Sequence, residues 1–113
     1  MSTTTLYRPV SQKELDLIAQ ADWKAFPPRL PEQPIFYPVL NVEYARRITV
    51  EWNIPAYGKS YVTKFEVDTA YLSKFEVQNV GGDGIDELWI PAEELAEFNS
   101  HIVGNIEVIE THE

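Results

Sequence analysis

The stretch from Phe26 to Pro38, FPPRLPEQPIFYP, decides how this chain folds, because it holds five of the eight prolines in 113 residues. Proline fixes φ and donates no backbone hydrogen bond, which excludes this stretch from helix interiors and central strands. A long irregular segment in a small domain is usually functional or disordered. Disorder is disfavoured by the interleaved apolar residues, which are Phe26, Leu30, Ile35, Phe36 and Tyr37. We therefore predict an ordered wall packed over the fold, carrying the cation Arg29 beside a small-molecule site.

Length and composition limit the class of protein. A chain of this length has room for a single core, so we expect one domain over residues 1–113. The absence of cysteine excludes disulfides, thiolate metal sites and cysteine nucleophiles. The start, MSTTTLYRPV, lacks the basic region and apolar run of a signal peptide. No stretch approaches the roughly 20 apolar residues that span a bilayer. We expect a cytoplasmic protein with no membrane partner.

Charge is distributed unevenly along the chain. The net charge is −9; the first 75 residues carry nine bases and eight acids, whereas ten acids and no base follow from Glu76 onward. Nucleic-acid binding through phosphate neutralisation is disfavoured by this total. The acidic second half is either a solvated surface or a surface for a basic partner. An anion site in the first half stays open, with Arg8 and Arg29 as candidates.

Local signals place the first two elements. Residues Thr4–Pro9 read as a strand, because a threonine run leads into alternating larger residues. Ser11 followed by Glu14 three residues later predicts a capping box at the start of a helix. This strand–helix pair should therefore form the N-terminal unit of the fold.

A second helix is expected after the proline segment. Asn41 can cap it, and Ala45, Ile48 and Trp52 have the spacing of one apolar stripe. Pro55 should end it after about a dozen residues, because the residue before a proline is disfavoured in helical conformation.

The remaining chain alternates strands with short helices. Tyr61–Val67 has the period of a half-buried strand, and Asp68 can cap one helical turn. A strand over 75–80 is followed by a glycine turn over 81–84 and a second strand over 85–90. A helix over 91–98 and a final strand over 105–110 complete the chain. This order predicts an α+β fold with a split β-sheet and short helices.

Several familiar catalytic sites find no support. The only histidines are His101 and His112, which is too few for an ordinary zinc site. No nucleophile elbow is present for a serine triad, and the GGDG turn lacks the lysine of a phosphate loop. We therefore expect no metal site.

A different set of side chains lies beside predicted turns and strand ends. Arg8 ends the first strand, Tyr37 and Tyr44 flank the proline segment, and Glu87 shares a strand face with Trp89. A carboxylate among aromatic rings is partly desolvated, which is typical of functional sites. The alternatives are that Glu87 faces water on an edge strand, that Arg8 pairs with a nearby acid, and that both tyrosines belong to the core.

These segments resemble the ADP-ribosyltransferase fold. The resemblance rests on LYRPV near the start, QPIFYPVLNVEYARRI in the middle, and DELWIP and HIVGNIEVI late in the chain. The chain is also similar to small bacterial proteins described as ADP-ribosylation/crystallin J1-like. The likeness spans nearly the whole sequence through short motifs.

The resemblance implies roles for five residues and NAD as the substrate. Arg8 matches the cation that holds NAD, Tyr37 an aromatic that stacks on nicotinamide, and Tyr44 a second aromatic of that motif. Glu87 matches the catalytic glutamate, which would stabilise oxocarbenium-like charge as nicotinamide leaves. Arg29 would join Arg8 at the diphosphate.

We therefore expect an NAD-dependent ADP-ribosyltransferase, or an NAD-cleaving domain, whose acceptor is a small molecule or a protein. This reading requires Arg8 and Glu87 to point into one cleft. The alternative is a non-catalytic ligand- or protein-binding module that uses the acidic C-terminal half.

Overall fold

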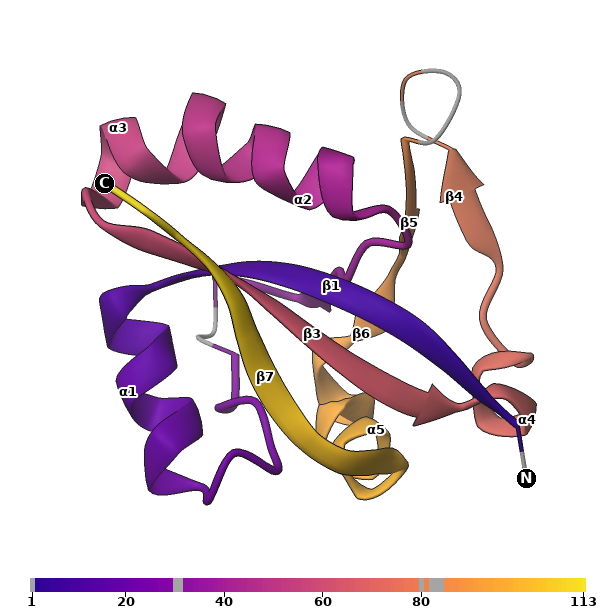
Figure 1. Cartoon of the computed structure of the whole chain (residues 1–113). Helices are drawn as coiled ribbons and strands as arrows, with labels where there is room; N and C mark the ends of the chain where they lie inside the picture. Colours follow the sequence, from indigo (N-terminus) through magenta and orange to yellow (C-terminus); the bar gives the residue numbers. More distant parts are fainter. Residues whose placement is uncertain (1, 30–31, 80, 82–84) are drawn as a thin grey trace.

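An antiparallel sheet forms the centre of the computed structural model, which describes residues 2–29, 32–79, 81 and 85–113 (Figure 1). Strand β1 (Thr3–Ser11) pairs with β3 (Ser60–Asp68) along its whole length. On its other edge, β3 pairs with β7 (Ile102–His112). The predicted first strand and the predicted alternating strand are both confirmed.

A single residue, Val39, joins this sheet to a second strand pair. It forms antiparallel bridges to Tyr7 of β1 on one side and to Glu87 on the other. Glu87 lies in β5 (Asp86–Leu88), which pairs with β4 (Val77–Asn79). The sheet therefore runs from β7 through β3, β1 and Val39 to β5 and β4.

Two helix layers cover opposite faces of the sheet. Helix α1 (Gln12–Gln20) lies on one side, and the helical segment that begins with α2 (Val42–Ile48) lies on the other (Figure 1). Because strand side chains alternate, β1 contributes to both layers. Leu6 and Val10 enter the larger core with α1, whereas Tyr7 packs against the smaller cluster under α2.

The proline segment packs as a wall of the larger core, as predicted. Phe26 and Phe36 are buried, with ring centroids 5.0 Å apart. Phe36 belongs to β2 (Ile35–Phe36), which pairs with β6 (Ile90–Pro91). Ile35 is half-buried, and residues 30 and 31 lie outside the described residues.

The predicted capping box at α1 is only half formed. The Ser11 hydroxyl accepts a hydrogen bond from the Glu14 backbone N–H, at 3.4 Å. The Glu14 side chain does not return to the Ser11 backbone and pairs with the Arg8 guanidinium instead. A buried cation is a stronger partner for a carboxylate than one backbone N–H.

Asn41 caps α2 as predicted, but the expectation that Pro55 ends this helix is wrong. Helical backbone continues through a π-helical turn, η1 (Thr49–Asn53), into α3 (Ile54–Tyr57). Pro55 sits in the first turn of α3, the part of a helix in which proline is best tolerated. The wide turn also relieves the clash that a proline ring makes with the preceding carbonyls.

The same π turn moves Trp52 off the apolar stripe. Ala45 is fully buried, but Trp52 is 70% exposed. A π turn holds an extra residue, so side chains that follow Ile48 leave the α-helical face. Thr49, four residues after Ala45, is buried, and its hydroxyl donates to the Ala45 carbonyl at 2.8 Å.

The C-terminal elements are shorter or longer than predicted. Asp68 caps α4 (Thr69–Leu72) as expected. The expected strand over 85–90 is divided between β5 and β6, and the expected helix divides into η2 (Ala92–Glu94) and α5 (Leu95–Ser100). The final strand was expected to begin at residue 105, but Gly104 already lies within β7, at φ +80°. It is near an irregularity in the register between β3 and β7. Residues 82–84 of the predicted glycine turn lie outside the described residues.

The mixed α+β class is confirmed: antiparallel sheets combine with short helices. Among the described residues, no helix has the length and apolarity needed to cross a membrane.

Candidate functional site

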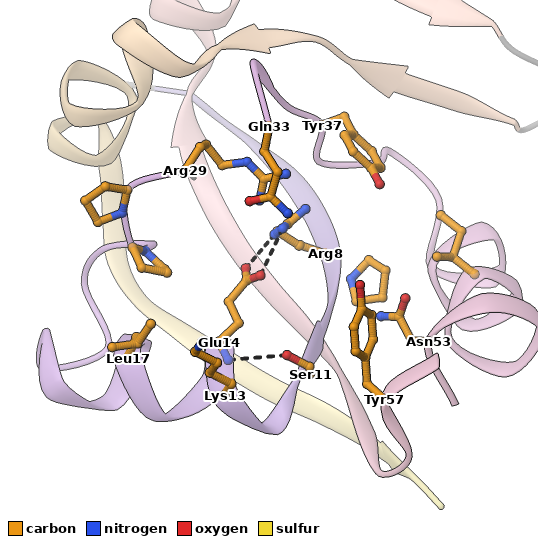
Figure 2. A pocket seen from close by; sticks show the side chains of 14 residues that line it. Arg8, Ser11, Lys13, Glu14, Leu17, Arg29, Gln33, Tyr37, Asn53 and Tyr57 are labelled. Atoms are coloured by element: carbon orange, nitrogen blue, oxygen red, sulfur yellow. Dashed lines mark hydrogen bonds and ion pairs between the residues drawn. The ribbon is translucent and has the colours of Figure 1, made fainter. Parts of the chain in front are cut away.

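A cleft of about 350 Å³ opens at the edge of β1 that faces away from β3 (Figure 2). Beyond the bridge between Tyr7 and Val39, this edge has no strand partner among the described residues. Pro9 lies on this edge, where proline is tolerated because it has no N–H to leave unpaired. The lining comes from β1, α1, the proline segment and the helical segment that ends in α3. The lining residues are Arg8, Pro9, Ser11, Lys13, Glu14, Leu17, Pro27, Pro28, Arg29, Gln33, Tyr37, Ile48, Asn53 and Tyr57. We call it the arginine cleft.

Arg8 lies at the centre of the arginine cleft and is held rigidly. Its Nε and Nη2 donate to the two Glu14 carboxylate oxygens, at 2.7 and 3.0 Å. Its guanidinium also lies 4.7 Å from the centroid of the Phe36 ring. Burial opposes the charge, but the Glu14 carboxylate outweighs burial and raises the pKa of Arg8. The expected alternative, that Arg8 pairs with a nearby acid, is confirmed.

Arg29 approaches Arg8 from the proline segment and forms no ion pair with any described residue. Figure 2 shows its side chain beside those of Arg8 and Gln33. Its Nε is buried and has no hydrogen-bond partner in the described part of the chain. Burial, followed by the neighbouring Arg8 charge, lowers the pKa of Arg29. A desolvated cation beside a second cation is stabilised by a bound anion.

Aromatic and apolar side chains form the walls. The Tyr37 ring centroid lies 5.8 Å from the Arg8 guanidinium carbon. Leu17 lies on the α1 side, and Tyr57 lies on the α3 side (Figure 2). Three prolines also line the cleft. The cleft volume is near the lower end of the range for small-molecule sites. The cleft therefore combines fixed cations with apolar walls.

Glu87 and Tyr44 form a separate cluster under α2. Glu87 is buried, and its carboxylate accepts hydrogen bonds from the Tyr44 hydroxyl at 3.1 Å and from Trp89 Nε1 at 2.6 Å. Burial and the neighbouring Glu87 charge raise the pKa of Tyr44 to about 12. The predicted aromatic setting of Glu87 and its shared face with Trp89 are confirmed. The cluster ties α2 to β5.

Arg8 and Glu87 project from opposite faces of the sheet, so the expectation that they share a cleft is wrong. Residues directly opposite in antiparallel strands share a face, which places Tyr7, Val39 and Glu87 together under α2. Arg8 follows Tyr7 in β1 and therefore points to the other face. Of the five residues predicted for one site, Arg8, Arg29 and Tyr37 line the arginine cleft, whereas Tyr44 and Glu87 do not.

Glu14 and Tyr57 are notable among the lining residues that were not predicted. Glu14 was assigned only to a helix cap, although a strand that turns directly into a helix brings residues six apart close together. No sequence pattern indicated Tyr57 as a residue of the cleft, since Pro55 was expected to end the helix before it. Its contribution depends on the π turn.

The described residues contain no group of three His, Asp or Glu side chains placed to hold a metal ion. No family model, curated protein or solved structure matches this chain. The resemblance to ADP-ribosyltransferases therefore stays a prediction from the motifs.

Proposed function

We propose that this protein is a non-catalytic binding module that holds a small anionic molecule in the arginine cleft. The proposal rests on one observation above all: Arg29, with a buried and unpartnered Nε, lies beside a second arginine whose only ion-pair partner among the described residues is Glu14. With Lys13 at the rim, the lining carries three bases and one acid. On a chain of net charge −9, this is a local positive site.

NAD cleavage by Glu87 receives no support from this arrangement. Catalysis needs the carboxylate beside the scissile bond of the bound substrate. Glu87 lies under α2, away from the arginines expected to bind the diphosphate, and both of its oxygens already accept hydrogen bonds. A ligand held by Arg8 and Arg29 would therefore lie on the other face of the sheet.

The acidic second half is also a weaker candidate for a binding surface than its charge suggests. Three of its acids pair with bases of the first half: Glu94 with Lys74, Glu110 with Arg46, and Glu113 with Lys59. These pairs reduce the negative charge left for a basic partner. The arginine cleft is the better-supported ligand site.

The test is an NMR titration of the ¹⁵N-labelled protein with phenylacetate, inorganic phosphate, phenyl phosphate and NAD. We expect at least one anion to shift resonances that surround the arginine cleft, with binding weakened by salt. Arg29→Gln should weaken that binding roughly tenfold or more, because it removes a charge-assisted donor. Arg47→Gln, which alters an exposed arginine paired with Glu51, is the matched control and should leave binding unchanged.

Two results would contradict the proposal. The first is the absence of any shift near the cleft with all four anions. The second is equal loss of binding in Arg29→Gln and Arg47→Gln, which would indicate only non-specific attraction. Release of nicotinamide from NAD would instead support the catalytic reading.

A further inference from the structure

Many residues that line the arginine cleft carry side-chain hydrogen-bond donors, whereas three of them are prolines. Pro9, Pro27 and Pro28 supply no backbone N–H to the lining. The Glu14 N–H at the start of α1 already donates to the Ser11 hydroxyl. Phosphate sites in proteins usually present several backbone N–H groups at a helix N-terminus or a glycine-rich loop. The described lining of the arginine cleft contains no glycine, and one N–H of the first turn of α1 is already occupied.

The two arginines suit a carboxylate. Arg8 uses Nε and Nη2 for Glu14, which leaves Nη1 without a hydrogen-bond partner among the described residues. The Nε of Arg29 is buried and has no hydrogen-bond partner within the described part of the protein. Two guanidinium groups can each donate to one oxygen of a carboxylate, because guanidinium groups recognise carboxylates, as they do phosphates, in a fork geometry.

Glu14 favours a singly charged ligand. Its carboxylate lines the same cleft and stays beside Arg8 through two hydrogen bonds. Attraction by the arginines and repulsion by Glu14 both grow with the ligand charge, so Glu14 acts by setting the balance of charge. Arg8, Arg29 and Glu14 together carry a net charge of +1, which one carboxylate neutralises.

The walls favour an apolar body. Leu17, Ile48 and the prolines supply aliphatic surface, and the ring of Tyr37 stands beside Arg8. Tyr57, on the opposite wall, is 70% exposed, so its ring is largely uncovered in this structure. An apolar group bound between these walls would cover that ring and gain the free energy of burial.

Building on the proposed function, we infer that the ligand of the arginine cleft is a monocarboxylate carried on an aromatic or other apolar body. The carboxylate lies against Arg8 and Arg29, and the body lies between Tyr57 and the proline wall. The same chemistry occurs in a free organic acid and at the C-terminus of a peptide that ends in an aromatic residue. The cleft volume of about 350 Å³ favours the free acid.

A set of matched probes tests the ligand class. We expect phenylacetate to bind about tenfold more tightly than acetate, because its ring buries additional apolar surface. The neutral analogue 2-phenylethanol should not bind measurably, and phenyl phosphate should bind more weakly than phenylacetate. N-acetyl-glycyl-phenylalanine represents the peptide source and should bind more weakly than phenylacetate if the free acid is the better fit.

Two equally exposed aromatic residues provide the variant and its control. Tyr57 and Trp52 are each 70% exposed and lie in the same helical segment, but only Tyr57 lines the arginine cleft. Tyr57→Ala should weaken phenylacetate binding roughly threefold to tenfold and leave acetate binding unchanged, the size of effect expected for one aromatic contact. Trp52→Ala should change neither.

The outcomes separate this inference from the proposed function. Tighter binding of phenyl phosphate than of phenylacetate at the cleft would overturn the carboxylate inference and leave the anion site intact. Tighter binding of the peptide would overturn the free-acid assignment. Equal effects of Tyr57→Ala and Trp52→Ala would overturn the placement of the apolar body. If no anion shifts the cleft resonances, both the inference and the proposed function fail.

Discussion

Replacement of Glu14 by Gln tests the central contact of the arginine cleft. Arg8 and Glu14 form a nearly buried ion pair, with 8% and 18% of their side chains exposed. The substitution keeps the shape of Glu14 and one acceptor oxygen but removes the charge that balances Arg8. The variant therefore asks whether a buried arginine in β1 depends on one carboxylate.

The expected loss of stability follows from the burial of the pair. Breaking a buried ion pair by removing one partner destabilises a protein by about 3 to 5 kcal/mol. The glutamine oxygen retains one of the two hydrogen bonds to Arg8, and the partial exposure of Glu14 lets water replace part of the other. We therefore expect the free energy of unfolding to fall by about 2 to 3 kcal/mol.

Urea denaturation followed by circular dichroism measures this change. Glu51→Gln is the matched control, because Glu51 pairs with Arg47 on the exposed surface of the helical segment. Its free energy of unfolding should change by less than about 0.5 kcal/mol. Equal stabilities of Glu14→Gln and Glu51→Gln would refute the view that Glu14 supports Arg8.

The same substitution should change ligand binding in the opposite direction. Without the Glu14 carboxylate, the cleft repels an anion less, so phenylacetate should bind Glu14→Gln more tightly than the unmodified protein. Because a ligand that binds only the folded state raises its stability, excess phenylacetate should restore part of the loss. Weaker binding to Glu14→Gln would indicate that Glu14 orients Arg8 for the ligand.

Two other predictions concern groups outside the cleft. Burial, followed by the Glu87 charge, raises the pKa of Tyr44 to about 12. Glu87→Gln removes only the second cause, so this pKa should fall part of the way toward 10.0, as measured by near-ultraviolet absorbance titration; an unchanged pKa would contradict this. The hydrogen bonds from Arg46 lower the pKa of Glu110 from 4.5 to about 2, so its contribution to stability is complete above pH 4.5 and is lost as the pH falls toward 2. The stability difference between the unmodified protein and Glu110→Gln should therefore shrink over that window in denaturation experiments at several pH values, and a difference that grows there would be inconsistent with this sign.

The features that the sequence predicted well depend on residues close together in the chain. Ser11, Asn41 and Asp68 cap helices as expected, because a cap bonds to N–H groups only two or three residues away. The alternation in β3 follows from the two-residue period of a strand, which any register preserves. The proline segment likewise excludes regular structure through its own backbone chemistry.

The composition of the site depended on pairings between distant residues. Val39 brings Tyr7 and Glu87 together across 32 and 48 positions of the chain. A shift of one residue in that register would turn Glu87 to the other face of the sheet, and nothing local in the sequence determines the register. The sequence analysis grouped Arg8 and Arg29 as one anion site, but only the tertiary structure placed Glu87 on the opposite face of the sheet. Strand partners far away in the chain decide which face each strand side chain occupies.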